Sequence, residues 1–179
     1  VRAGLSLDVS ALRSGGHKLG VGSSAAGAAA AAAAVFARRG ASLAEAAVRA
    51  RVFEAALAGH RAVAPEGSGA DVAAAVFGGF VAFRRAARAP GAPVERAALS
   101  APAGLRFRVV WTGRAARTSD FVARVRALEA HDPTTFARVM GELREGATDF
   151  DAALRAGDAE RTVAAAAAYG EAMARLGAA

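Results

Sequence analysis

The 179-residue sequence predicts an α+β fold, with helices and strands in separate stretches of the chain. Helical patterns dominate as far as residue 77, short segments with alternating apolar and polar residues follow, and helical patterns return from residue 118 onward. A hydrophobic content of 54% with 22% charged residues suffices for a packed core and argues against global disorder. We expect two parts, residues 1–98 and 99–179, that divide near Ala98–Gly104.

A long run of small residues predicts the first helix. Leu19 to Ala37 holds 19 residues without a charge, most of them Ala, Gly or Ser. Alanine is near neutral for membrane insertion, so we expect a buried helix over Ser23–Arg38, ended by Gly40, and no membrane span. Upstream, Leu5 and Leu7 alternate with polar residues, which favours the end of a strand.

Two further helices are expected before the strands. Ser42 and Glu45 have the spacing of a capping box, which predicts a helix reaching about Ala62. Its apolar face comprises Val48, Val52, Ala55 and Ala56. A loop over residues 64–69 and the pair Gly78-Gly79 enclose a short helix over Asp71–Phe77.

The remaining elements are strands, then helices. Alternation predicts strands over Phe80–Arg85, Val94–Leu99 and Leu105–Trp111. Helices are expected over Ser119–Glu129, Pro133–Glu145, Phe150–Ala156 and Ala159–Leu176, separated by Asp132, Gly146 and Gly157. Tyr169 and Met173 are expected in the core of this helical part.

Cysteine content and charge narrow the classes of function. The absence of cysteine excludes disulfide scaffolds, thiolate metal sites and cysteine nucleophiles. The net charge of +7 comes almost wholly from arginine, because Lys18 is the single lysine among 23 basic residues. Such a composition often reflects codon bias, so the charge alone says little about function. No secretory signal is visible, and a cytoplasmic location is expected.

The strongest local signal is the segment K-L-G-V-G-S-S, from Lys18 to Ser24, directly before the alanine-rich helix. Glycines let a phosphate approach the backbone closely, and a helix N-terminus adds about half a positive charge. The lysine supplies a point charge, and a serine hydroxyl can bind Mg²⁺. The lysine precedes the glycines, so the segment is not a Walker P-loop. The alternative is a glycine turn with Ser23 as a helix cap.

A second signal is the segment G-S-G-A-D-V-A-A-A-V-F-G, from Gly67 to Gly78. Asp71 opens a helix behind a Gly-Ser-Gly loop, a place that suits a general base or a charge anchor. The alternative is that Asp71 only caps its helix or interacts favourably with the helix dipole.

Together the two segments resemble the second conserved motif and the aspartate segment of the GHMP kinase superfamily. The phosphomevalonate kinase branch is the most similar, since it has K-x-G-L-G-S-S and G-S-G-x-D-V-A-A-A-V-[FY]-G at these places. Val110 to Thr118 also resembles its W-T-G-x-x-A-S-T segment, with Arg117 in place of the serine. The resemblance runs from about Leu7 to Thr118. It implies part of a two-lobed fold, with a ribosomal-protein-S5-like ATP-binding lobe in residues 1–98 and a ferredoxin-like lobe in residues 99–179.

The resemblance implies a kinase that uses ATP and Mg²⁺ to convert phosphomevalonate to diphosphomevalonate in isoprenoid precursor synthesis. Asp71 and Lys18 would be catalytic, and Ser24 and Asp71 would lie at the magnesium ion. The nucleotide phosphates would be bound by Gly20, Val21, Gly22, Ser23, Ser24 and Ala25. The acceptor would be bound near Ser68, Gly69 and Thr118. The partners would be ATP and a phosphorylated small molecule, with no nucleic acid and no membrane, and the oligomeric state is open.

Other parts of the family pattern are not in this sequence. The first motif, a P-G-[KR] loop, would lie upstream of Val1, and the glycine-rich third motif would lie beyond Ala179. An internal fragment of a longer kinase is therefore expected, and whether it is active alone is open. Mevalonate kinase carries a metal-binding glutamate about eleven residues before its aspartate, where this sequence has His60.

Three other interpretations stay open: mevalonate kinase or another GHMP sugar or alcohol kinase, a non-catalytic binding module, and a nucleic-acid binder. The last would use a basic face made of Arg84, Arg85, Arg88, Arg106 and Arg108. The sequence has three histidines, His17, His60 and His131. Their spacing is not that of metal ligands, and we expect each of them at the surface or in the core.

Overall fold

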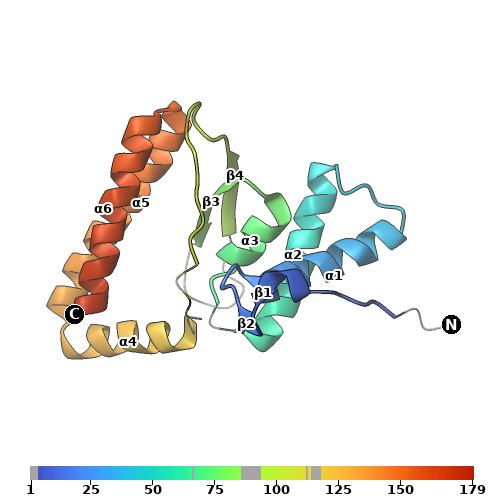
Figure 1. Ribbon diagram of the computed structural model, residues 1–179, viewed down its shortest axis with the longest axis horizontal. Coiled ribbons are helices and arrows are strands. Elements are labelled where there is room, and N and C mark those ends of the chain that lie inside the picture. The colour runs from blue at the N-terminus through green and yellow to red at the C-terminus, as the bar shows by residue number, and fades with distance from the viewer. Residues whose placement is uncertain (1–3, 66, 86–93, 112, 114–117) are drawn as a thin grey trace. The chain divides into compact units, whose positions relative to one another are not determined.

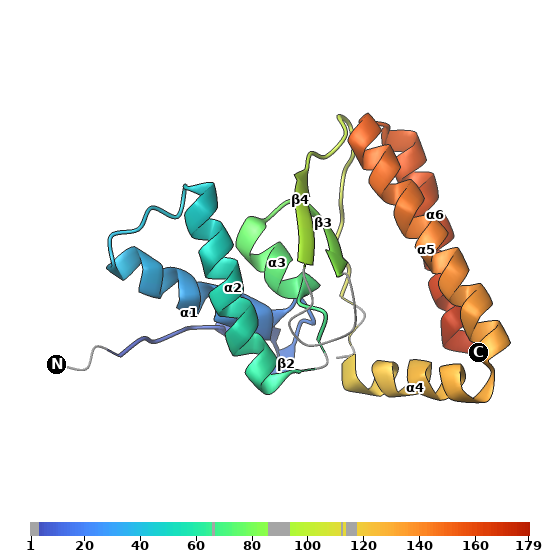
Figure 2. The same cartoon turned by 180° about the vertical axis from the view of Figure 1, so that it is seen from behind.

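The computed structural model describes residues 4–65, 67–85, 94–111, 113 and 118–179, and for Val94, Thr118 and Ser119 it describes the backbone. Over these residues, six α-helices accompany two two-stranded sheets, which is an α+β composition. The chain forms two compact units, Val1–Ala98 and Leu99–Ala179, whose elements are labelled in Figures 1 and 2. The assignment of these units to two kinase lobes stays a prediction.

The first unit contains a small hairpin, three helices and a second strand pair (Figure 1). In chain order its elements are η1 (Ser10–Leu12), β1 (Arg13–Ser14), β2 (His17–Lys18), α1 (Ser23–Arg38), α2 (Ala46–Val63), α3 (Ala70–Phe77), β3 (Phe80–Arg85) and β4 (Val94–Leu99). β1 and β2 pair antiparallel, and β3 pairs with β4. The three helices pack on one another, and α3 also contacts β3.

The core of the first unit lies where α1, α2 and α3 meet. Its buried residues are Ala25, Phe53, Ala56, Leu57, Val72 and Ala73. The Phe53 ring is fully buried, and its centroid lies 5.7 Å from that of Phe77. The small side chain of Ala25 lets the other helices approach α1 closely, and burial of a ring such as Phe53 contributes about 1.5–3 kcal/mol. The core therefore fixes the first turns of α1 and α3 against the middle of α2.

The second unit is helical, with α4 (Thr118–His131), α5 (Pro133–Ala156) and α6 (Ala159–Ala178). Figures 1 and 2 both show α5 and α6 side by side, and Val139, Leu143 and Ala172 are buried between them. Gly157, in the left-handed conformation at φ 68°, turns the chain from one to the other. Among the residues that the structure describes, none of the helices has both the length and the apolar character that crossing a bilayer requires.

Several predicted elements are confirmed. The first helix and the two strands β3 and β4 have the predicted bounds, and α3 begins at Ala70, one residue before the predicted start. On α2, Val48, Val52 and Ala56 are buried as expected, whereas Ala55 is exposed. Gly157 ends α5 as predicted.

Two predictions at element boundaries are wrong. The helix α2 begins at Ala46 with Glu45 as N-cap, and no side chain caps it, so Ser42 and Glu45 do not form a capping box. Gly146 does not break α5, which continues to Ala156. A Cβ at Gly146 would lie 3.4 Å from the Cα and Cβ atoms of Tyr169, so the glycine permits close packing of α5 on α6. The side chain of Tyr169 is 38% exposed at this contact, and Met173 is also exposed, so neither belongs to the core.

Two expected strands are also absent from the described residues. Leu5 to Asp8 and Leu105 to Trp111 have no regular secondary structure. In the second segment Val109 and Val110 are more than 80% exposed, because no strand pairs with this part of the chain. Alternation alone indicates a strand only where a partner strand supplies the hydrogen bonds.

The cap of α5 gives a prediction about acid stability. The Thr135 amide donates a 2.9 Å hydrogen bond to Asp132 Oδ1 and holds the pKa of that carboxyl below its ordinary value of 3.8. The ionised carboxylate therefore stabilises the fold above this value, and that contribution is lost as the pH falls through the lowered pKa. Because asparagine also caps helices well, Asp132→Asn should lose less stability between pH 7 and pH 3 than wild type does. Urea denaturation at both pH values measures this, and equal losses would contradict the assignment.

Candidate active site

The glycine segment forms an open turn at the N-terminus of α1. Gly20 and Gly22 have φ values of 76° and 75°, in the left-handed region that favours glycine. Gly22 is the N-cap, and no side chain caps the helix, so the alternative with Ser23 as the cap is wrong. A Cβ at either glycine would meet nothing within 4 Å. The turn therefore leaves room beside its two glycines at the positive end of the helix dipole, an arrangement suited to an anion.

Other residues of this segment differ in exposure. Val21 and Ser24 are exposed, Ser23 is partly buried, and Ala25 is completely buried in the core. Ala25 therefore serves to anchor the turn, and only its backbone could contact a ligand.

Lys18 lies beside a second cation at the base of the glycine turn. It is paired across the β1–β2 hairpin with Arg13, and both side chains are exposed. Neither forms an ion pair with a carboxylate within the described part of the chain. Like charges directly opposite each other destabilise a strand pair, and an anion bound between them would relieve this repulsion.

Asp71 lies in the first turn of α3, and its side chain is 45% exposed. The Val72 amide donates a 2.9 Å hydrogen bond to Asp71 Oδ1. Ser68 Oγ accepts a 3.2 Å hydrogen bond from the Ala70 amide, so Ser68, and not Asp71, satisfies the first amide of the helix. Asp71 therefore retains free acceptor capacity on its exposed side.

The loop before α3 is held from both ends. Gly69 is buried in the left-handed conformation at φ 88°, against Leu57 of α2. Arg85 of β3 donates a long hydrogen bond, 3.5 Å, from a guanidinium nitrogen to the Gly67 carbonyl. The exposed Arg84 is its neighbour, while Arg88 lies outside the described residues.

His60 joins the two segments. It comes from α2, is only 8% exposed, and its Nε2 lies 3.4 Å from Ser24 Oγ and 3.7 Å from Asp71 Oδ2. These contacts bring together residues that are 36 positions apart in the sequence. The sequence predicts His60 at the surface or in the core, but it does not predict these contacts. The signal that could have found it is helical spacing, because Phe53, Ala56 and His60 continue one buried face of α2.

The three side chains are not a hydrolase triad. In such a triad the serine and the aspartate contact opposite nitrogens of the imidazole, so that a proton can pass from the serine to the ring. Here both contact Nε2, and within the described part of the chain Nδ1 is buried without a hydrogen-bond partner. The arrangement can hold Ser24 and Asp71 near each other, but it cannot activate the serine as a nucleophile.

The oxygen atoms of Ser24 and Asp71 suit a hard cation such as Mg²⁺. Magnesium usually takes one or two protein oxygens and completes its shell with water and substrate phosphates. Within the described residues no three His, Asp or Glu side chains gather in a group that could hold a metal ion. A magnesium ion would add positive charge beside the glycine turn.

The structure does not bring every predicted site residue together. Lys18 forms no hydrogen bond or ion pair with Ser24 or Asp71, and Thr118 begins α4 of the other unit. The side chain of Thr118, together with Thr112 and residues 114–117, lies outside the described part of the chain. The roles of Gly20, Val21, Gly22, Ser23, Ser24, Ala25, Ser68, Gly69 and Thr118 in binding ligands stay predictions.

Part of this chain is similar to a kinase. The relative is the phosphomevalonate kinase of Streptomyces sp. (strain CL190), at 34% identity over 66% of this chain and 36% of the relative. The chain thus spans little more than a third of that relative's length. No family model matches the chain, and no solved structure matches it.

Proposed function

We propose that this chain is part of a GHMP-type kinase that transfers a phosphoryl group from ATP, with Mg²⁺, to phosphomevalonate. The observation that carries the proposal is the contact of Ser24 and Asp71 with one nitrogen of His60, which places the glycine turn beside the aspartate helix. Phosphoryl transfer needs mainly positioning and charge neutralisation, and these two segments supply both. The similarity to a phosphomevalonate kinase supports the choice of phosphomevalonate as the acceptor. ATP as donor favours a cytoplasmic enzyme.

Each segment has a task in this proposal. The amides that follow Gly22 bind phosphate oxygens, and Lys18 adds a mobile positive charge beside them. Ser24 and Asp71 contribute oxygen ligands to Mg²⁺, which when bound neutralises charge on the transferring group. Ser68 and Gly69 precede Asp71 at the start of α3 and would help to bind the acceptor.

The chemistry of the acceptor decides what Asp71 does. A phosphate monoester, with a second pKa of about 6, is largely a dianion at neutral pH and needs no base. One of its oxygens forms a bond to the γ-phosphorus while the bond to the bridging oxygen of ADP breaks. Asp71 then acts through the metal and through orientation. With a hydroxyl acceptor such as mevalonate, Asp71 would also take the hydroxyl proton.

A panel of acceptors tests the choice of substrate. With the full-length protein and ATP, phosphomevalonate should be turned over faster than mevalonate, homoserine or galactose, as measured by ADP release in a coupled assay. Preference for an unphosphorylated alcohol would move the assignment to another GHMP kinase. If MgATP binds but no acceptor is phosphorylated, the chain is better described as a binding module.

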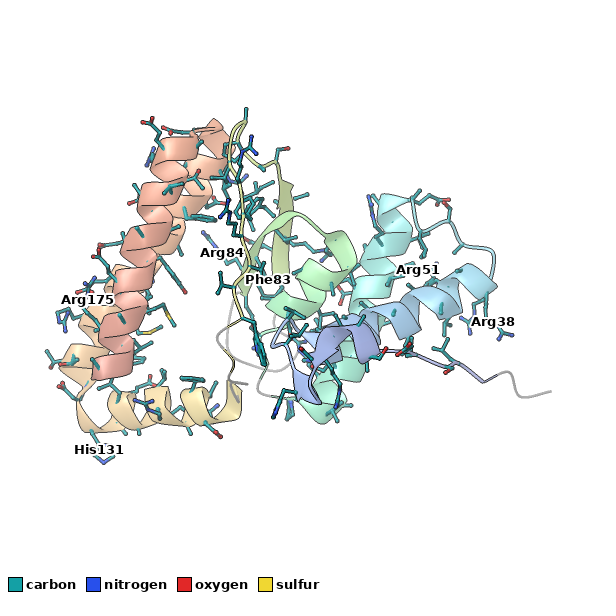
Figure 3. The ribbon with its side chains drawn as sticks, in the orientation of Figure 1. Arg38, Arg51, Phe83, Arg84, His131 and Arg175 are labelled. Atoms are coloured by element: carbon teal, nitrogen blue, oxygen red, sulfur yellow. The ribbon has the colours of Figure 1, made fainter. Side chains whose placement is uncertain are left out.

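Substitution of Lys18 tests the phosphate-binding role of the hairpin. Lys18→Ala should weaken MgATP binding by about 10- to 100-fold, because one charge-assisted contact to phosphate contributes roughly 1.5–3 kcal/mol when it is partly desolvated. The matched control is Arg38→Ala, which removes an exposed cation at the opposite end of α1 (Figure 3). Isothermal titration calorimetry measures both affinities. An equal effect of the two substitutions would show that Lys18 acts only through net charge.

A further inference from the structure

We propose that His60 is a positioning residue whose Nε2–H group orients the Asp71 carboxylate and the Ser24 hydroxyl toward one another. Its kinetic consequence rests on the proposed phosphoryl transfer, whereas the contact itself can be tested without any activity. His60 would act through Asp71 and Ser24 and need not touch the substrates.

The burial of His60 favours one tautomer. Its Nδ1 atom is buried and has no hydrogen-bond partner among the residues that the structure describes. A proton on Nδ1 would leave a buried donor unpaired and would turn a bare Nε2 lone pair toward the negative carboxylate of Asp71. A proton on Nε2 avoids both penalties, because the N–H group then points at two acceptors. The structure therefore favours the tautomer with the proton on Nε2.

The proton is shared unequally between its two neighbours. The 3.4 Å distance to Ser24 Oγ is within hydrogen-bonding reach, while the 3.7 Å distance to Asp71 Oδ2 is that of an electrostatic contact. Hydrogen bonds within active sites are often long before substrates bind. A small movement of either side chain would bring both oxygens to this one donor.

The Asp71 carboxylate is restrained at both of its oxygen atoms. Its Oδ1 atom already accepts from the Val72 amide, which fixes one end of the carboxylate. His60 restrains the other end, Oδ2, from the buried side. The exposed side of the carboxylate then faces the ligands in one orientation. The donor comes from α2, so it also links α1 to α3 at the point where the glycine turn and the aspartate loop meet.

A pair of isosteric substitutions tests the positioning role. In His60→Gln the side-chain amide nitrogen can reach the place of Nε2, whereas in His60→Asn it reaches only the place of Nδ1. We expect His60→Asn to lower kcat by about 10- to 100-fold, the usual effect of losing a supporting hydrogen bond, with a smaller change in the KM for ATP. His60→Gln should recover most of kcat. Equal losses in both variants, or a change in KM alone, would overturn the proposal.

A spectroscopic measurement tests the contacts of His60 Nε2–H with Ser24 and Asp71 independently of catalysis. In ¹H–¹⁵N correlation spectra of the imidazole rings of this chain, we expect His60 to carry its proton on Nε2. Asp71→Asn and Ser24→Ala should each shift the Nε2 resonance, while Glu45→Gln, an exposed carboxylate substitution in the same unit, should not. A proton on Nδ1, or an Nε2 resonance that neither substitution shifts, would refute the contact of Nε2–H with Ser24 and Asp71. Absence of ATP turnover in wild type would refute the proposed function and leave this result unaffected.

Discussion

Asp71→Asn is expected to lower the rate of phosphoryl transfer to phosphomevalonate by about 10²–10⁴-fold while leaving the fold intact. The substitution removes the negative charge that would bind Mg²⁺, but the amide oxygen can still accept the hydrogen bond from Val72. The side chain is also 45% exposed, so the change does not disturb the core. Steady-state kinetics of the full-length protein, with circular dichroism as the test of folding, measures the effect.

The control for Asp71 is a carboxylate of the same unit outside the proposed site. Glu45, the exposed N-cap of α2, provides it through Glu45→Gln, which should retain the turnover of wild type. If Asp71→Asn also retained wild-type turnover, the assigned role of Asp71 would be wrong. If both variants lost activity equally, the loss would be due to net charge and not to a specific site.

Gly69→Ala is expected to destabilise the first unit by about 2–5 kcal/mol. The left-handed conformation at φ 88° costs an L-residue roughly 1–2 kcal/mol. The new Cβ would also overlap with Cδ1 of Leu57, which is buried and cannot change its rotamer freely. Overpacking of this kind adds about 1–3 kcal/mol. The same substitution would displace the start of α3 and with it Asp71.

Gly40→Ala separates backbone strain from overlap. Gly40 has a similar φ of 78°, but a Cβ there meets nothing within 4 Å, so only the roughly 1–2 kcal/mol of backbone strain is expected. Urea denaturation followed by circular dichroism measures both variants, and hydrogen exchange of peptides from residues 46–77 assigns the transition to the first unit. Equal destabilisation by the two substitutions would show that Leu57 accommodates the new methyl group.

Local patterns predicted the elements whose boundaries depend on nearby residues. The alanine-rich run and Gly40 defined α1, and Gly78-Gly79 marked the change from α3 to β3. The predictions failed where the outcome depends on distant packing. Gly146 is a helix breaker by composition, yet in α5 it gives α6 room to approach, and Leu105–Trp111 alternates without a strand beside it.

For the candidate site, too, the sequence predicts local features but not contacts between distant segments. The sequence located the glycine turn and the aspartate separately, each with an alternative of purely local origin. It could not show that Ser24 and Asp71 meet, because the meeting depends on how α1, α2 and α3 pack around Phe53 and Leu57. His60 became visible only through that packing, since its spacing on α2 marks it as buried but does not reveal what it contacts.

The measurement that tests the proposed function most directly is ³¹P nuclear magnetic resonance of the full-length protein with MgATP and phosphomevalonate. We predict that the signals of ATP and of the phosphate monoester will fall together, while those of ADP and of a diphosphate ester on the acceptor rise in equal amounts. Conversion of ATP to ADP and inorganic phosphate alone, or unchanged ATP in the presence of the acceptor, would contradict the assignment of this chain to a phosphomevalonate-phosphorylating kinase.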